Sequence, residues 1–175
     1  MRLVRTCVTV PRMDVGLATL DDLAAIVAIN NHVAATSIAN FATDPVTVDE
    51  QRPWFDRHAA SGPYRLLVAR SGPDVLGYAA SGPYRMHEAF RHTVEVSISL
   101  HRSARGQGIG TALYSALFDH LVGEPVHVAL AGIAVPNDAS VALHRKFGFT
   151  DVGTFTDYAI KNNHYLSSLW MQRTL

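Results

Sequence analysis

The sequence has little cysteine and no net charge. Its 175 residues include one cysteine, Cys7, which excludes an internal disulfide framework. No motif pairs Cys7 with a base, so we interpret it as an incidental thiol rather than a nucleophile. Fifteen basic residues balance fifteen acidic ones, and this balance argues against a nucleic-acid or anionic-membrane partner attracted by bulk charge.

Membrane-spanning and secretory signals are also missing. No apolar stretch approaches the ~20 residues that a membrane span needs. Residues 1–13 carry three arginines but no clear apolar region followed by a small-residue cleavage site. We therefore expect a cytoplasmic protein in which residues 1–13 are an N-terminal extension and residues 14–175 form a single domain.

The histidines lack the spacing of a metal site. The chain has nine of them, but His87 and His92 are five residues apart and no His-x-x-x-His pair falls on an expected helix. We therefore expect no bound metal.

Hydrophobic periodicity and turn residues predict a mixed α/β chain. The expected order is strand, two helices, three strands, helix, strand, helix and two strands. The strands are expected at 14–18, 65–69, 75–80, 93–100, 126–133, 149–155 and 165–172. The first helix is expected to begin after a cap at Thr19 or Asp21 and to run through residue 33, and the others are expected at 47–60, 112–121 and 137–147. The three middle strands are expected to form an antiparallel meander, which is not compatible with a doubly wound sheet.

Helix ends are marked by specific residues. Thr47 and Glu50 have the spacing of a capping box. Gly123 suits the position just after a helix, and Asn137 or Asp138 suits the start of the next one.

The strand expected at 93–100 alternates strictly between apolar and polar residues. Val94, Val96, Ile98 and Leu100 point to one face, and Thr93, Glu95, Ser97 and Ser99 point to the other. Taken alone, Glu95 is then a solvent-facing carboxylate on a strand.

Three glycines follow this strand, at positions 106, 108 and 110, directly before a helix. Such a loop lets backbone N–H groups and the positive end of the helix face a phosphate, and Arg102 and Arg105 flank it. A Walker A loop would need a lysine after Gly110, and a dinucleotide fingerprint would place its third glycine one residue later. A flexible turn remains the simplest alternative.

Two segments resemble the conserved blocks of the GNAT acetyltransferases. Arg105 to Gly110, with the sequence Arg-Gly-Gln-Gly-Ile-Gly, resembles their acetyl-CoA pyrophosphate loop. The segment from Asn137 to Phe149 resembles their second block, in which an asparagine opens a short helix that ends in Gly-Phe. The resemblance covers residues 14–175. It implies a central, mostly antiparallel twisted sheet of about six or seven strands flanked by about four helices, with acetyl-CoA as cofactor.

Two further segments, residues 36–41 and 88–95, resemble the phosphinothricin and methionine sulfoximine acetyltransferases within that family. This resemblance implies direct acetyl transfer to the amine of a small amino-acid analogue, in a homodimer, with Glu95 as general base. An α-amine is mostly ammonium at neutral pH, so it needs such a base before it can attack a thioester. Tyr165 and Ser167 depart from the subfamily's usual Trp-x-Asp, which leaves the acceptor pocket open to a different specificity.

The resemblance also assigns individual residues. His144 is a catalytic acid, a cofactor contact or a packing histidine. Arg85 pairs with an acceptor carboxylate or is a surface arginine beside core aromatics. The expected cofactor-binding residues are Ser97, Ile98, Ser99, Leu100, Arg105, Gly106, Gln107, Gly108, Ile109, Gly110, Asn137 and Ser140. The expected substrate-binding residues are Phe41, Arg85, Met86, His87, Phe90 and Thr93.

Two other functions stay open at this point. One is acetylation of a different amine, such as a peptide N-terminus or a polyamine, although near-neutral charge does not favour a polyamine. The other is an acyl-CoA-binding domain without catalysis, against which Glu95 at the expected position counts.

Overall fold

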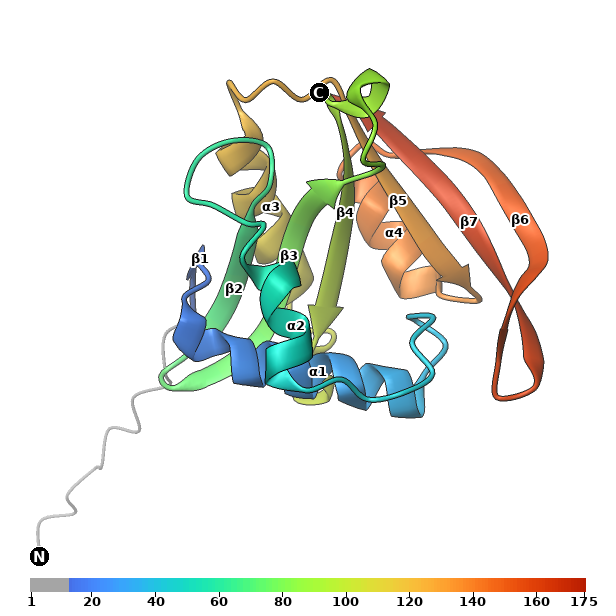
Figure 1. The fold of residues 1–175 in the computed structure, drawn as a ribbon, viewed down its shortest axis with the longest axis horizontal. Coiled ribbons are helices and arrows are strands. Elements are labelled where there is room, and N and C mark those ends of the chain that lie inside the picture. The colour runs from blue at the N-terminus through green and yellow to red at the C-terminus, as the bar shows by residue number, and fades with distance from the viewer. Residues whose placement is uncertain (1–12) are drawn as a thin grey trace, which may run out of the picture.

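The computed structural model describes residues 13–175, so residues 1–12 of the expected extension, with Cys7, lie outside the described part. Within that part, one sheet holds seven strands (Figure 1). Their bounds are β1 Met13–Leu17, β2 Leu66–Ser71, β3 Asp74–Pro83, β4 Thr93–Leu100, β5 Val128–Val135, β6 Thr150–Lys161 and β7 His164–Thr174. The strand order is β1-β2-β3-β4-β5-β7-β6, and β4 with β5 is the one parallel pair among the described strands. The prediction of a mostly antiparallel sheet with a β2–β3–β4 meander is confirmed.

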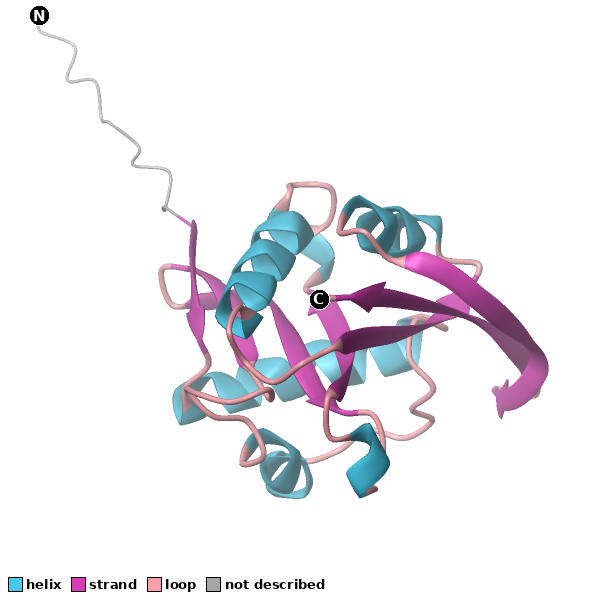
Figure 2. Ribbon diagram, turned by 90° about the horizontal axis from the view of Figure 1, so that it is seen from above, coloured by secondary structure: helices cyan, strands magenta, loops and turns pink. Residues whose placement is uncertain are grey.

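Helices cover both faces of this sheet, as Figure 2 shows from above. They are α1 Leu23–Thr36, α2 Val48–Phe55, α3 Ile109–Leu121 and α4 Asp138–Lys146. The main core forms where Leu113, Tyr114 and Leu117 of α3 pack on the fully buried Val94 and Ala129 of the sheet. A second core lies on the opposite face, where Ile26 and Ile29 of α1 pack against β2 and β3.

Most predicted helix ends are confirmed by hydrogen bonds. The Glu50 carboxylate accepts from the Thr47 backbone N–H at 2.8 Å, and the Thr47 hydroxyl accepts from the Glu50 N–H at 3.2 Å. Asn137 caps α4 through its Oδ1, which accepts from the Ser140 N–H at 3.3 Å. Gly123 follows α3 with a positive φ of 81°.

The predicted end of the second helix is wrong. We expected it to reach residue 60, whereas α2 ends at Phe55. Beyond that point the His58 N–H donates to Phe55 O, three residues back, and the Ala59 N–H donates to Tyr64 O. The helix therefore ends in a tighter turn, because the next backbone N–H, that of Ala59, donates to a carbonyl outside the helix.

The last two strands are longer than predicted and form a hairpin. We expected strands at 149–155 and 165–172, but β6 and β7 together run from Thr150 to Thr174. The turn between them consists of Asn162 and Asn163, whose φ angles are 50° and 60°. Asparagine tolerates this left-handed region, so a two-residue turn joins the strands directly.

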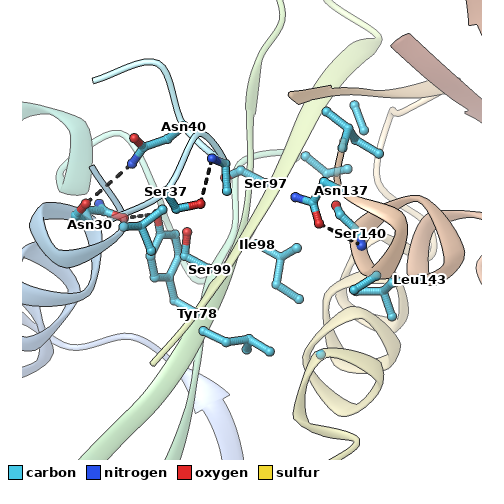
Figure 3. A pocket seen from close by; sticks show the side chains of 18 of the residues that line it. Asn30, Ser37, Asn40, Tyr78, Ser97, Ile98, Ser99, Asn137, Ser140 and Leu143 are labelled. Atoms are coloured by element: carbon cyan, nitrogen blue, oxygen red, sulfur yellow. Dashed lines mark hydrogen bonds between the residues drawn. The ribbon is translucent and has the colours of Figure 1, made fainter. Parts of the chain in front are cut away.

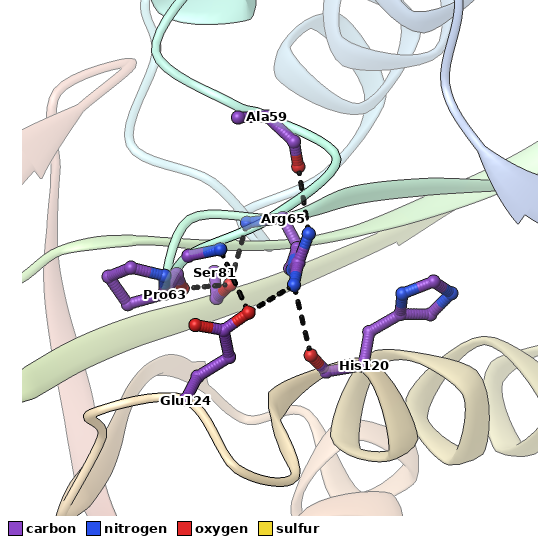
Figure 4. Close-up of polar contacts among 7 residues, drawn as sticks. Ala59, Pro63, Arg65, Ser81, His120 and Glu124 are labelled. Atoms are coloured by element: carbon purple, nitrogen blue, oxygen red, sulfur yellow. Dashed lines mark hydrogen bonds and ion pairs between the residues drawn. The ribbon is translucent and has the colours of Figure 1, made fainter.

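A buried polar network ties the end of α3 to the sheet (Figure 4). The Arg65 guanidinium, 5% exposed, pairs with the Glu124 carboxylate and donates to the carbonyl oxygens of Ala59 at 3.3 Å and His120 at 3.4 Å. The Arg65 backbone N–H donates to the hydroxyl of Ser81 on β3 at 3.0 Å. This network fixes the C-terminal end of α3 relative to β2 and β3.

None of the helices within residues 13–175 combines the length and apolar character that a membrane crossing requires. The same residues bring no group of three or more His, Cys, Asp or Glu side chains into a metal-binding arrangement.

Candidate active site

The two parallel strands at the centre of the sheet separate along their length. β4 pairs with β5 over three residues, from Thr93 opposite Val128 to Glu95 opposite Leu130. Beyond Glu95 the strands diverge (Figure 1), although β4 stays paired with β3 and β5 stays paired with β7. The edges of β4 and β5 that face each other therefore carry backbone N–H and C=O groups with no strand partner, and such groups seek another partner.

A cavity of about 740 Å³ occupies this opening, within the ~300–1,000 Å³ typical of small-molecule sites. In Figure 3 β4 runs through its middle, with Asn30 and Ser37 on one side and Asn137 and Ser140 on the other. The cavity thus joins two regions that are far apart in the sequence.

The glycine loop forms one end of this cavity. Gly106 and Gly108 have positive φ angles of 74° and 79°, which residues with a side chain rarely adopt. A Cβ at either position would have no heavy atom within 4 Å, so the loop surface is open above them. The third glycine has a different role: a Cβ on Gly110 would lie 3.2 Å from the Leu143 side chain, so it permits close packing of α3 on α4.

Helix α3 begins directly after this loop. Its first N–H groups have no acceptor one turn earlier, and the helix dipole adds positive potential at the same place. Arg105 lines the cavity beside them. The loop, the helix end and the arginine together fit a diphosphate.

Most of the predicted cofactor residues meet in this cavity. Ser97, Ile98, Ser99, Leu100, Arg105, Gly106, Gly108, Gly110, Asn137 and Ser140 all line it. Gln107 and Ile109 are not among the lining residues. The Gln107 side chain donates to the Ser103 carbonyl, and Ile109 is buried in the main core.

Glu95 lines the same cavity from the polar face of β4. Its side chain is partly buried, and burial raises the pKa of the carboxyl above 4.5. No arginine, lysine or histidine within residues 13–175 forms an ion pair with it. A carboxylate with a raised pKa, unpaired and facing a cavity, is suited to accept a proton.

His144 also lines the cavity, but both of its ring nitrogens have protein partners. Nδ1 lies 2.8 Å from the Ser140 carbonyl oxygen, which can only accept, so the ring proton is on Nδ1. Nε2 then accepts from the Tyr114 hydroxyl at 2.8 Å. Burial lowers the pKa of His144, which keeps the ring neutral near pH 7. This arrangement favours the packing role among the alternatives for His144.

The predicted substrate residues do not line the cavity of their own chain. Arg85 stacks over Tyr84 and Phe90, 5.2 and 5.7 Å from the ring centroids. Met86 is 89% exposed, and His87 accepts from the Ala89 N–H through Nδ1 at 3.1 Å. These residues lie in the segment between β3 and β4, before the strand reaches the cavity.

Two other predicted substrate residues lie nearer to it. Thr93 is the first residue of β4, opposite Val128 of β5. Phe41 lies beside the cavity-lining Asn40 and Ala42, and its ring meets the Tyr158 ring edge-on at 5.8 Å.

Comparison with known proteins identifies the family. The acetyltransferase (GNAT) family matches residues 30–149, which is more than half of the chain. The chain belongs to the GNAT family. A phosphinothricin N-acetyltransferase of Streptomyces coelicolor is 42% identical over 157 residues, which cover 89% of this chain and 92% of that protein. An L-methionine sulfoximine/L-methionine sulfone acetyltransferase of Pseudomonas paraeruginosa is 36% identical, with 93% and 92% covered.

A solved GNAT structure agrees with the described fold. The phosphinothricin acetyltransferase of Sinorhizobium meliloti, solved in complex with acetyl-CoA, superposes with a TM-score of 0.87 at 30% identity. The superposition covers 93% of this chain and 88% of that one.

Several residues of this GNAT cavity were not foreseen from the sequence. Asn30 and Asn31 line it from α1, and Tyr78 lines it from β3. The Tyr78 hydroxyl donates to Asn30 Oδ1 at 2.6 Å. Two adjacent asparagines in a mostly apolar helix are a signal in the sequence for such a site, because these residues cost helix stability unless their side chains find partners.

Proposed function

We propose that this GNAT acetyltransferase moves an acetyl group from acetyl-CoA to the amine of a small amino-acid analogue of the phosphinothricin, methionine sulfoximine or methionine sulfone type. The observation that carries the proposal is that one cavity contains both the glycine loop at the start of α3 and the unpaired carboxylate of Glu95. The names of the two relatives described above support this choice of acceptor.

The residues around the opening fit acetyl-CoA. Arg105, Gly106, Gly108 and the first N–H groups of α3 would hold the diphosphate. The unpaired edge of β4 from Ser97 to Leu100, with Asn137 and Ser140 across the cavity, would hydrogen-bond the amide groups of the pantetheine arm. When bound there, acetyl-CoA supplies the acetyl group as a thioester.

Glu95 has the role of general base in this proposal. Its carboxylate accepts the proton that an acceptor ammonium must lose before the amine can attack. The N–H groups of the neighbouring β4 edge donate toward the carbonyl oxygen and stabilise the negative charge that develops on it. The amine attacks the thioester carbonyl carbon directly. The C–N bond forms, the C–S bond breaks, and CoA leaves as a thiolate that takes a proton from solvent, so no acyl group is attached to the protein. His144, held neutral between Ser140 and Tyr114, maintains the packing of α4 on α3.

The acceptor would be recognised by residues of the strand β4, the segment before it and the loop after α1. We keep Phe41, Met86, His87, Phe90 and Thr93 as proposed contacts and assign Arg85 to an acceptor carboxylate. The structure places Arg85 outside the cavity of its own chain, so this part of the proposal requires movement of residues 84–92 or a second chain.

A peptide N-terminus is the second candidate acceptor, and the charges of the cavity favour it. The ionisable side chains among the described lining residues are Asp44, Glu95, Arg105 and His144, plus the buried tyrosines. The one arginine, Arg105, is at the diphosphate end of the cavity. The opposite part, which we call the acceptor end, therefore offers no cation for a free carboxylate. A peptide N-terminal amine carries no carboxylate beside it.

The test is release of CoA thiol with acetyl-CoA and a panel of acceptors. The panel contains phosphinothricin, methionine sulfoximine, methionine sulfone, plain amino acids and a peptide with a free N-terminus. We expect turnover of at least one amino-acid analogue, with a fall in kcat of about 10²-fold or more for Glu95→Gln. Asp56→Asn, which changes a surface carboxylate that is 51% exposed and does not line the cavity, is the control and keeps the wild-type rate.

The outcomes separate the alternatives. Arg85→Ala raises KM for an amino-acid acceptor and leaves KM for a peptide unchanged if the carboxylate assignment holds. An unchanged rate in Glu95→Gln removes that residue from its role. Calorimetric binding of CoA without turnover of any acceptor overturns the enzymatic proposal in favour of a binding domain.

We further propose a homodimer. The β6–β7 hairpin exposes large apolar side chains, with Val152 at 59%, Phe155 at 56% and Ile160 at 59%. Exposed apolar patches of this kind commonly mark protein contacts. Sedimentation analysis of the full chain measures the mass in solution, and a monomer at all concentrations would contradict this proposal. The cytoplasmic location stays a prediction from the sequence.

A further inference from the structure

Residues 37–46, between α1 and α2, form one wall of the cavity, and we call them the strap. Seven of them line it: Ser37, Ile38, Ala39, Asn40, Ala42, Asp44 and Val46. The strap contains no helix or strand. Its position therefore depends on bonds to neighbouring elements rather than on its own backbone hydrogen bonds.

Helix α1 holds one end of the strap. The Asn31 side-chain amide donates to the Val46 carbonyl at 2.8 Å and accepts from the Val46 N–H at 3.0 Å. The Asn40 side chain reaches the Asn30 carbonyl at 3.4 Å. A bidentate amide of this kind fixes the end that leads into α2.

The other end is held by Lys161 of the β6–β7 hairpin, whose place in the fold Figure 1 shows. Its ammonium donates to the Ser37 carbonyl at 2.9 Å, the Asn40 carbonyl at 3.0 Å and Asn40 Oδ1 at 3.4 Å. All three acceptors belong to the strap. Lys161 is 4% exposed, which is unusual for lysine.

This arrangement is costly unless the bonds are kept. A buried ammonium loses its hydration, and three carbonyl oxygens match its three protons. Lys161 is the last residue of β6, directly before the Asn162–Asn163 turn. The hairpin and the strap are thereby connected through one side chain.

We propose that Lys161 is a positioning residue that holds the strap against the β6–β7 hairpin and so determines the shape of the acceptor end of the cavity. The acceptor part of this inference rests on the function proposed above. Lys161 is not itself among the lining residues, so it acts through Ser37 and Asn40, which are.

Hydrogen–deuterium exchange of the full-length protein without ligands tests the structural part. Lys161→Met keeps the length of the side chain but removes its donors, so amides of residues 37–46 should exchange at least about tenfold faster, while those of α3 stay protected. Lys161→Arg keeps the charge with a different donor geometry and should give an intermediate rate. Lys146→Met, the same substitution at an exposed lysine of α4 that makes no bond to the strap, is the matched control.

Steady-state kinetics test the functional part. In Lys161→Met we expect kcat/KM for the acceptor to fall by roughly 10- to 100-fold, because a small displacement of a binding wall is sufficient for that loss. KM for acetyl-CoA should change less than twofold, since none of the proposed cofactor contacts belongs to the strap. Lys161→Arg should recover part of the loss.

Two results would overturn the inference. One is strap exchange at the wild-type rate in both Lys161 variants. The other is an equal rise of both KM values, which would indicate a general loss of structure. If the wild type acetylates no acceptor, the proposed function fails, while the exchange measurement still decides the role of Lys161.

Discussion

Glu50 and Glu95 show how local surroundings shift the same carboxyl group in opposite directions. The Thr47 N–H and hydroxyl donate to the Glu50 carboxylate at 2.8 and 2.9 Å, and these bonds lower its pKa below 4.5. Glu95 lies in the cavity, where burial disfavours the charged form and raises its pKa. The pKa of each carboxyl group can therefore be compared with that of the other in the same protein.

At the residue scale we predict that these groups titrate in a fixed order. The chain has four glutamates, at 50, 88, 95 and 124, so their side-chain carboxyl carbons can be assigned by NMR through single Glu→Gln variants. As pH falls, Glu95 should protonate before Glu50, because burial raises the pKa of Glu95 whereas the hydrogen bonds from Thr47 lower that of Glu50. Since a general base works only when deprotonated, activity should decrease on the acid side at the pH where Glu95 protonates. Glu95 titrating below Glu50 would contradict the burial argument.

At the scale of elements, helix α3 carries a positive-φ glycine near each end. Gly108 at its start has a φ of 79° and Gly123 after its end has a φ of 81°, and a Cβ at either would meet nothing within 4 Å. The two sites impose the same backbone strain on an alanine. They differ in that only Gly108 lines the cavity.

Alanine at these two positions therefore separates strain from binding. Gly108→Ala and Gly123→Ala should each lower the free energy of unfolding by about 1–2 kcal/mol, the usual cost of a left-handed residue with a side chain. Only Gly108→Ala should raise the Kd for CoA, because it disturbs the N–H groups that face the diphosphate. Urea unfolding and calorimetric titration measure the two quantities. Equal CoA affinity in both variants would contradict the assigned role of the loop.

At the scale of the whole molecule, the Arg65–Glu124 pair connects elements that are distant in sequence. It joins the residue before β2 to the segment after α3, and the Gly62 N–H also donates to Glu124 at 2.8 Å. Arg65 is 5% exposed, so its guanidinium has little access to water if its partner is removed.

We predict that Glu124→Gln lowers the free energy of unfolding by about 1–3 kcal/mol, since a buried charge-assisted bond is weakened. Both KM values should stay at the wild-type level because the network is remote from the cavity. Asp56→Asn is the matched control: its partner Arg52 is 2.7 Å away, but the two side chains are 48% and 51% exposed, so the loss should be below about 1 kcal/mol. If Asp56→Asn lowered the free energy of unfolding as much as Glu124→Gln, the argument from burial would be contradicted.

Local patterns in the sequence were sufficient for much of the fold. Strict alternation marked β4 with its observed bounds, Thr93–Leu100, because one face of the strand packs on a core. The helix caps at Thr47 and Asn137 were readable because each is made by bonds within four residues. The glycine loop was found for the same reason, since positive φ at Gly106 and Gly108 is a local requirement.

Contacts between distant segments were beyond the sequence. The separation of β4 and β5 after Glu95, which creates the cavity, depends on how two strands about 35 residues apart in the chain twist relative to each other. The placement of Arg85 outside that cavity, and of Asn30 inside it, follows from the same packing. The sequence by itself determined the glycine loop, the caps and the polar face that carries Glu95, because these are set by short-range geometry. Only the tertiary structure decided that Lys161 bonds to the strap and that Glu95 faces a cavity, because both depend on long-range packing of the sheet.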